Sequence, residues 1–462
     1  MPALTKSASI DQKGLPARVR ILTAMMRQLI WNDMTTAEKE WIHQRGTAAD
    51  SAEELRPAIR SLVEDVRVRG DAALLDALER FDGVEIDADG IAVSAEEFER
   101  AVGSIDPDVH SAIRQMIANI RAFNEALLER RQSWTSEIAP GHTIGEKVGP
   151  VSDAALFCPS GKASYPSVLA QVATPAVVAG VPNLSVIVPP VPGSGGEVDD
   201  AVLVVAHELG LDRVFRVNGP AGVAAAAFGT DTIPAHSMVI GPGSPPVALA
   251  QLEVRAYGVD TVVLGPTESL VVADMSADPI LLAADLLNEA EHGTDSTVVL
   301  VTPNQAVIDA TIIELDRQAA ELPAARKEAA DSALGVNGGA ILVDSMEQAV
   351  EVANWFAAEH CQLAVANPWA VAEEIEHAGE LLLGQHTPFS VGNFTLGGPA
   401  ALPTGGFANR AGGITVEKFL KAGAIGHLTV DALRAVAEST IALSDHEGFD
   451  AHGNAIRVRD LR

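Results

Sequence analysis

Three neighbouring segments decide the fold class: AALFCPSG (154–161), SVLAQVATPAVVAGV (167–181) and LSVIVPP (184–190). The outer two are short apolar runs that end in turn-forming residues, which is typical of a buried strand followed by a turn. The middle segment is a longer run of small and aliphatic residues, which we interpret as a buried helix. A strand, a helix and a second strand in this order predict a parallel sheet with helices on both faces, as in nucleotide-binding lobes.

The alternation of strands and helices continues toward the C-terminus. RVFRVNG (213–219) and MVIGPGS (238–244) continue the lobe that begins with these three segments. Another alternating stretch begins at DTVVLGPTESLVVAD (260–274) and reaches AGELLLG (378–384). We therefore expect an α/β protein with two lobes. Residues 52–128 carry apolar residues at helical spacing, and the chain becomes helical again after LPTGGFA, so helices flank the two lobes.

Composition limits the functions that are open to the chain. The 462 residues include 32 Lys and Arg against 62 Asp and Glu, a formal net charge of −30 that would repel a nucleic-acid backbone. The two cysteines cannot build a disulfide framework, and the first residues do not resemble a secretory signal. The longest apolar stretch, Val168 to Val191, is interrupted by Gln171 and by prolines, so it does not predict a membrane span. We expect a cytoplasmic protein with no nucleic-acid or membrane partner.

Two pairs of residues could bind a metal or transfer protons. In LLNEAEHG (286–293), Glu289 and His292 stand one helical turn apart and could hold one cation, although a solvated helix surface would explain the pair as well. Glu359 and His360 end the helical pattern ANWFAAEH and precede a strand. They fit an acid/base pair, or a helix end at which the histidine interacts favourably with the helix dipole.

The rest of the sequence gives weaker signals of function. The chain contains no glycine-rich fingerprint that would identify a dinucleotide site, no phosphate-binding loop and no HExxH zinc motif. HEGFDAH (446–452) carries Glu447 and His452, and by itself it fits a polar turn after a helix.

In their order along the chain, these residues lie within segments that resemble the histidinol dehydrogenase family over roughly residues 50–460. Nine segments carry the resemblance, and so many matches in one order exclude chance. From the N-terminus they are VRGDAALLDALERFDG, ALFCPSG, VNGPAGVAAAAFGTDTIP, VIGPGS, GPTESLVVAD, ADLLNEAEHG, AAEHCQLAV, LPTGGFA and EGFDAH.

The resemblance implies two incomplete Rossmann-like parallel-sheet lobes with small helical segments at both ends, in an intertwined homodimer. It divides the chain into an N-terminal helical segment (1–54) and a first lobe with the metal and acid/base residues (55–157 and 268–414). A second lobe (158–267) would bind NAD, and a C-terminal helical tail (415–462) would complete the site of the partner subunit.

The resemblance also implies a reaction, in which a small primary alcohol is oxidised through the aldehyde to a carboxylate by two hydride transfers to NAD. His360 would take the alcohol proton, and Glu359 would activate water for attack on the aldehyde. The positions that match the zinc ligands are Glu289, His292, Asn393 and His452. Positions matching substrate contacts are Thr267, Glu289, His292, His360, Asn393, Glu447 and His452, and those matching NAD contacts are Phe157, Ala221 and Ser244.

Several of these positions depart from the family pattern. Glu289 stands where the family has glutamine and Asn393 where it has aspartate, so the charge of the ligand set is conserved and zinc is still expected. Gly398-Pro399-Ala400-Ala401 replaces a Gly-Pro-Asn-His segment, and its histidine is lost to an alanine. Polar residues of the family are also replaced at Phe157, Ala221, Ser244 and Thr267.

A pocket that has lost these partners is expected to take a substrate other than histidinol. One known for paralogues of the family is 2,3-dihydroxypropane-1-sulfonate, or sulfopropanediol, whose anion would need a cation such as His142, Lys147, Lys162 or Arg410. Three alternatives remain: histidinol dehydrogenase itself, a metal-dependent hydrolase in which Glu359 and zinc activate water, and a paralogue that binds a ligand without catalysis.

Overall fold

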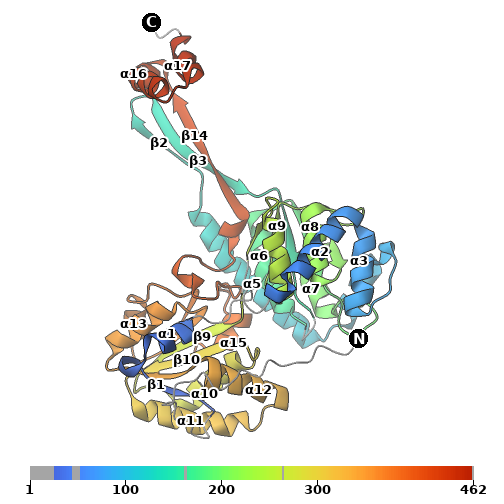
Figure 1. The fold of residues 1–462 in the computed structure, drawn as a ribbon, viewed down its shortest axis with the longest axis vertical. Helices are drawn as coiled ribbons and strands as arrows, with labels where there is room; N and C mark the ends of the chain where they lie inside the picture. Colours follow the sequence, from blue (N-terminus) through green and yellow to red (C-terminus); the bar gives the residue numbers. More distant parts are fainter. Residues whose placement is uncertain (1–24, 44–52, 161–163, 263–264, 460–462) are drawn as a thin grey trace.

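The computed structural model describes residues 25–43, 53–160, 164–262 and 265–459. Two α/β lobes lie side by side, and a long arm projects from them and carries the C-terminal helices at its tip (Figure 1). Among the helices of the described ranges, none is long and apolar enough to cross a membrane.

The first lobe is built on a sheet of six strands that are all parallel, which confirms the expected parallel pairing. Alternate residues of each strand face opposite sides. Leu270 and Val272 therefore pack into one apolar cluster, and Val271 and Ala273 into another on the opposite face. In spatial order the strands are β1 (Gln28–Ile30), β11 (Gly339–Leu342), β10 (Thr297–Thr302), β9 (Glu268–Ala273), β12 (His360–Ala364) and β13 (Glu380–Leu383).

The helices of this lobe cover both faces of the sheet. Helix α13 ends at Phe356, earlier than the sequence pattern suggested, because Ala357 adopts a left-handed backbone conformation with φ of 50°. Glu359 therefore lies outside the helix, and His360 begins β12. The helices are α1 (Thr36–His43), α10 (Pro279–Ala290), α11 (Gln305–Ala319), α12 (Ala324–Ser332), α13 (Met346–Phe356), α14 (Pro368–Ala372) and α15 (Phe389–Phe394).

The second lobe is built on a sheet of five parallel strands. In spatial order these are β6 (Val214–Arg216), β5 (Asn183–Val188), β4 (Asp153–Phe157), β7 (Met238–Ile240) and β8 (Asp260–Thr261). The connecting helices are α6 (Pro166–Ala179), α7 (Asp200–Glu208), α8 (Gly219–Phe228) and α9 (Pro245–Arg255). The strand order reverses at β4, which has β5 on one side and β7 on the other.

The helices that precede β4 belong to the five-stranded lobe, so our assignment of residues 55–157 to the lobe with the metal residues was wrong. The apolar side chains of Ile59, Val63 and Val66 join the core that contains Ala155 and Phe157 of β4. These helices pack on the five-stranded sheet because their apolar faces are buried there, and not on the sheet to which the family resemblance assigned them. They are α2 (Arg56–Arg69), α3 (Asp71–Ala77), α4 (Ala95–Ser104) and α5 (Pro107–Arg130).

The two ends of the chain also differ from the expected helical segments. Strand β1 of the N-terminal segment pairs with β11 at the edge of the six-stranded sheet. The C-terminal tail begins with a nine-residue strand, β14 (Leu420–Leu428), which pairs with β3 (His142–Pro150), and β3 pairs in turn with β2 (Trp134–Ala139). This antiparallel sheet is the arm, and it carries α16 (Val430–His446) and α17 (Asp450–Arg457) at its tip (Figure 1).

Candidate active site

A cavity of about 1770 Å³ lies between the two lobes and is lined by both of them. The five-stranded lobe contributes the carboxyl ends of β4 and β7, the point at which the strand order reverses and where open α/β sheets bind their ligands. The six-stranded lobe contributes the amino ends of its strands, because Thr267 precedes β9 and His360 starts β12. Seven of the expected site residues line the cavity: Phe157, Ser244, Thr267, His292, Glu359, His360 and Asn393.

His360 is held between two carboxylates. Its Nδ1 lies 2.9 Å from Oε2 of Glu380, the first residue of the neighbouring strand β13, and its Nε2 lies 3.9 Å from Oε1 of Glu359. Phe389 packs edge-on against the imidazole ring. Because the carboxylate of Glu380 accepts a hydrogen bond from Nδ1, the proton of a neutral imidazole lies on Nδ1. Nε2 is then the nitrogen that can accept a proton.

Glu359 and His360 are both buried, and their pKa values are perturbed as expected for acid/base residues. Burial raises the pKa of Glu359 to about 8, and the charge of His360 opposes this increase. Burial on its own lowers the pKa of His360, but the hydrogen bond to Glu380 and the charge of Glu359 outweigh it and raise the pKa to about 9. Both pKa values are thus shifted upward from the ordinary values of their groups, and geometry places the two groups together in the cavity.

Glu289 and Asn393 meet next to this pair. Nδ2 of Asn393 donates to Oε1 of Glu289 over 3.2 Å, and Oε2 of the fully buried Glu289 has no hydrogen-bond partner in the described part of the chain. His292 places Nδ1 3.2 Å from the backbone oxygen of Glu289, which leaves its Nε2 with a free lone pair. A carboxylate oxygen, an amide oxygen and an imidazole nitrogen are a donor set that fits zinc.

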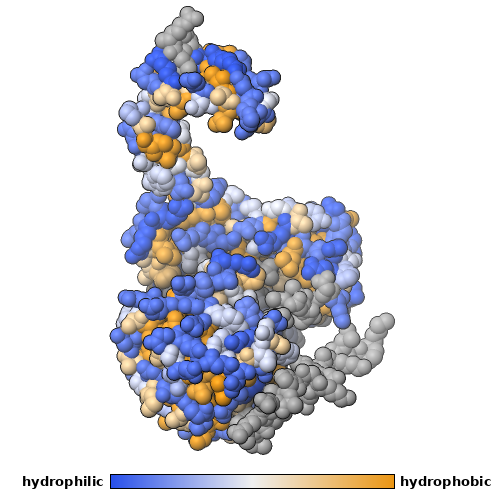
Figure 2. Space-filling view, turned by 60° about the vertical axis from the view of Figure 1, so that its left-hand side comes forward, coloured by the Kyte–Doolittle hydropathy of each residue, from blue (hydrophilic) through white to orange (hydrophobic). Residues whose placement is uncertain are grey.

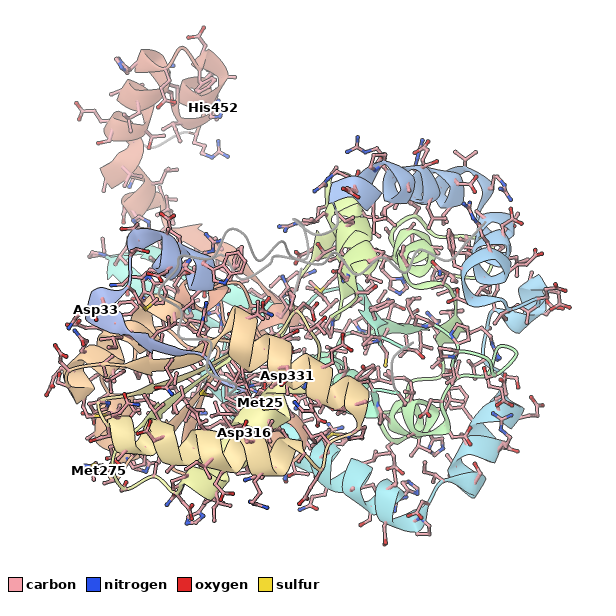
Figure 3. The ribbon with its side chains drawn as sticks, turned by 60° about the horizontal axis from the view of Figure 1, so that its bottom comes forward. Met25, Asp33, Met275, Asp316, Asp331 and His452 are labelled. Atoms are coloured by element: carbon pink, nitrogen blue, oxygen red, sulfur yellow. The ribbon has the colours of Figure 1, made fainter. Side chains whose placement is uncertain are left out.

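The fourth expected ligand is far from this group within one chain. His452 lies on α17 at the tip of the arm, well away from the two lobes (Figure 3), and Glu447 precedes it on the same tip. Among the described residues, no three His, Cys, Asp or Glu side chains converge closely enough to hold a metal. One chain therefore brings together Glu289, His292 and Asn393, and leaves Glu447 and His452 outside the cavity.

Comparison with known proteins identifies the family of the chain. The family model for histidinol dehydrogenase matches residues 45–460. The chain is 39% identical over 404 residues to a histidinol dehydrogenase homolog of Colwellia psychrerythraea, covering 87% of this chain and 90% of that protein. It is 38% identical over 424 residues to the histidinol dehydrogenase of a Synechococcus strain, covering 92% and 96% of the two chains.

The chain belongs to the histidinol dehydrogenase family. Its fold is that of the crystal structure of histidinol dehydrogenase from Elizabethkingia anophelis, with a TM-score of 0.88 and 28% identity over 94% of this chain and 98% of that one. The resemblance inferred from sequence motifs is thereby confirmed, and with it an NAD-dependent type of dehydrogenase.

The NAD positions expected from the histidinol dehydrogenase family are only partly brought to the cavity. Phe157 and Ser244 line it at the carboxyl ends of β4 and β7, but Ala221 is fully buried within α8 and is not part of the lining. Two glycines keep this wall open, since a Cβ at Gly219 would lie 2.9 Å from Cγ2 of Val247, and one at Gly243 would lie 2.3 Å from Cγ1 of the same residue. At these two positions the wall therefore exposes the backbone, which lets a flat ligand approach closely.

Three of the four cations that we expected for an anionic substrate do not line the cavity. His142 and Lys147 lie on β3 of the arm, and the guanidinium of Arg410 lies over the ring of Phe407, 3.9 Å from its centroid. Lys162 lies outside the described residues. The described part of the chain thus offers no support for these candidates as a sulfonate site.

Glu380 is the main site residue that sequence reasoning missed. It is the only charged residue in the apolar segment AGELLLG, and its side chain is 7% exposed. A lone acid in a buried strand could have been noticed, but its partner could not, because the pairing of β12 with β13 decides that Glu380 stands beside His360. Glycines make room for it, since a Cβ at Gly392 would lie 2.9 Å from Oε2 of Glu380.

Replacing Glu380 by glutamine should reduce kcat by about 10- to 100-fold, the usual cost of removing an orienting partner of a functional histidine. The carboxylate raises the pKa of His360, so its loss should lower that pKa. The neutral base would then persist to lower pH, and the acid limb of the kcat/KM profile should move to lower pH. Steady-state kinetics between pH 6 and 10 will measure this shift, and a profile unchanged in position would contradict the role of Glu380.

Proposed function

We propose that the protein is a zinc-dependent dehydrogenase that oxidises a small primary alcohol through the aldehyde to a carboxylate with NAD. The observation that carries the proposal is the buried acidic cluster around His360 in the cavity between the lobes. As whole residues, Glu289 and Glu359 are at most 7% exposed, and the side chain of Glu380 is 7% exposed. Oε2 of Glu289 has no hydrogen-bond partner in the described part of the chain, so a divalent cation beside it would stabilise this buried carboxylate.

The residues of this chain supply the proton transfers. His360, with Nδ1 bonded to Glu380, accepts the alcohol proton at Nε2 while the carbon loses a hydride. Glu359 then takes a proton from a water molecule that adds to the aldehyde, and the hydrate loses a second hydride to give the acid. Two NAD molecules bound in succession would each receive one hydride, and zinc held by Glu289, His292 and Asn393 would polarise the substrate oxygen.

The arm suggests how the missing residues Glu447 and His452 reach a site. The arm and the terminal helices carry apolar side chains on their surface (Figure 2), which is unusual for a projecting element unless a partner covers it. The exposed apolar residues of the arm and tip include Trp134, Ile138, Ile425, Val430, Leu443 and Phe449. We propose a homodimer in which each arm crosses to the other subunit and brings His452 to its metal site.

The names of the relatives favour histidinol as the first alcohol to test. The proteins compared above are histidinol dehydrogenases or a homolog of one. A different small alcohol is the second candidate, because the cavity wall carries Ala400 and Ala401 where the family pattern has a histidine. Sulfopropanediol has weaker support than histidinol, since three of its expected cations, His142, Lys147 and Arg410, do not line the cavity.

The test is formation of NADH by the purified protein with L-histidinol, 2,3-dihydroxypropane-1-sulfonate and 1-butanol. We expect turnover with at least one of the two polar alcohols, with two NADH formed per alcohol consumed. Removal of metal by a chelator should abolish this activity, and zinc should restore it. Release of one NADH per alcohol would contradict the two-step reaction, and full activity in metal-free protein would remove zinc from the mechanism.

A further inference from the structure

Gln171 is a polar residue in an apolar helix, and nothing in the proton-transfer scheme uses it. It lies on α6 among Leu169, Ala170 and Val172, all fully buried, and is itself 3% exposed. It nevertheless belongs to the lining of the cavity between the lobes. A glutamine in such a position is costly unless both ends of its amide group are hydrogen-bonded.

One end of the amide is bonded and the other is not. Oε1 of Gln171 accepts a hydrogen bond from the backbone N–H of Ala400 over 3.2 Å. Because this partner can only donate, it identifies the atom it contacts as the oxygen, and the amide orientation is thereby decided. The Nε2 group has no hydrogen-bond partner in the described part of the chain.

The bonded end ties Gln171 to the proton-transfer residues. Ala400 lines the cavity and lies two residues after Gly398, where a Cβ would lie 3.3 Å from Oε1 of Glu380. Glu380 in turn bonds His360. Gln171 is therefore connected to the catalytic histidine through the loop that contains Gly398 and Ala400.

We propose that Gln171 is a specificity-determining residue, whose Nε2 donates a hydrogen bond to an acceptor at the end of the substrate remote from the reacting alcohol. The proposal rests on the proposed function and names its substrate class. The remote group must be an acceptor, such as a hydroxyl, carboxylate or sulfonate oxygen or an unprotonated imidazole nitrogen. An ammonium group cannot take that place, because it has only donors to offer. Ala400 and Ala401 leave space beside the amide for this group.

Two substitutions separate the donor from the shape of the side chain. Gln171→Met removes both polar atoms at similar volume. Gln171→Glu keeps an oxygen that can accept from Ala400, but it replaces the donor by a second acceptor. Thr174→Val is the matched control, because Thr174 lies one turn further along α6 and also has a buried unpartnered oxygen, but it does not line the cavity.

The experiment measures equilibrium dissociation constants of L-histidinol, 2,3-dihydroxypropane-1-sulfonate and 1-butanol by calorimetry, with the zinc-loaded proteins in the absence of NAD, so that no alcohol is oxidised during the measurement. For at least one polar alcohol that binds to wild type, we expect Gln171→Met to weaken binding by about 10- to 100-fold, the usual loss when a buried hydrogen bond to a ligand is removed. Gln171→Glu should weaken it at least as much. Binding of 1-butanol should be unchanged, and Thr174→Val should bind all three as wild type does.

Kinetic measurements distinguish failure of the role of Gln171 from failure of the proposed dehydrogenase activity. We expect the two Gln171 variants to raise KM while kcat changes by less than about threefold, since the residue lies away from the reacting atoms. Equal dissociation constants in wild type and Gln171→Met, or no binding of either polar alcohol by wild type, would overturn the assignment. Binding that depends on Gln171 without any NADH formation would instead reject the proposed dehydrogenase and leave the inference standing.

Discussion

Replacing His360 by asparagine should lower kcat by roughly 100- to 10,000-fold, the range attributed to a positioned acid/base group. His360 combines the features of such a group, since it lines the cavity, is 2% exposed and has one nitrogen bonded to Glu380. Asparagine can keep a polar group near Glu380, but it cannot accept the alcohol proton. Stopped-flow and steady-state measurements of NADH formation will determine the loss.

The same variant should still bind its ligands, because the loss concerns proton transfer rather than the cavity. Dissociation constants of NAD and of the alcohol should stay within about threefold of wild type, as expected for an interaction that matters mainly in the transition state. His377→Asn is the matched control, since His377 is a half-buried histidine of the same lobe that does not line the cavity. Near-normal kcat for His360→Asn would remove His360 from the chemistry.

Mixing two inactive proteins should restore activity if the sites are shared between subunits. A His292→Ala subunit lacks a proposed zinc ligand in the cavity, and a His452→Ala subunit lacks the one proposed on α17 at the tip of the arm. In a heterodimer with exchanged arms, one site carries both lesions and the other carries none. About half of the sites in the heterodimers should then work, because a two-fold interface makes the exchange reciprocal.

A second mixture controls for the effect of mixing itself. His292→Ala combined with Glu359→Gln places both lesions in the cavity-lining residues, so each site of the heterodimer retains one lesion and no activity should return. Heterodimers must be verified by differently tagged subunits. If the first mixture stays inactive with heterodimers present, each site is built within one chain, and the exchange of arms is refuted.

The local pattern of the sequence was sufficient to predict the two parallel sheets. Strands such as β9 and β10 are buried along their whole length, so they appear in the sequence as continuous apolar runs between helical segments. The pairs Glu289 and His292, and Glu359 and His360, could be identified because each pair is close in sequence. The order and spacing of the motifs also predicted the family, because they can be seen in the sequence without a structure.

The antiparallel arm could not be predicted in the same way. Strand β14 pairs with β3 across about 280 residues of sequence, and along its length it is almost entirely exposed. A strand that is not buried leaves no regular apolar pattern, and no local signal tells which segment it will pair with. The tail therefore looked wholly helical. The helices α2–α5 were assigned to the wrong lobe because the family resemblance decided the assignment, whereas their apolar side chains pack in the cores of the five-stranded lobe.

The sequence by itself determined the class of fold, the family and the residue types available for catalysis, because these depend on composition and short spacings. Only the tertiary structure decided how the residues are combined. Pairing of β12 with β13 brings Glu380 to His360, and the approach of the loop at Ala400 to α6 leaves one end of Gln171 without a partner. The projection of the arm separates His452 from Glu289 within one chain. Each of these contacts joins residues that are remote in sequence, and only packing of the folded chain brings such residues together or holds them apart.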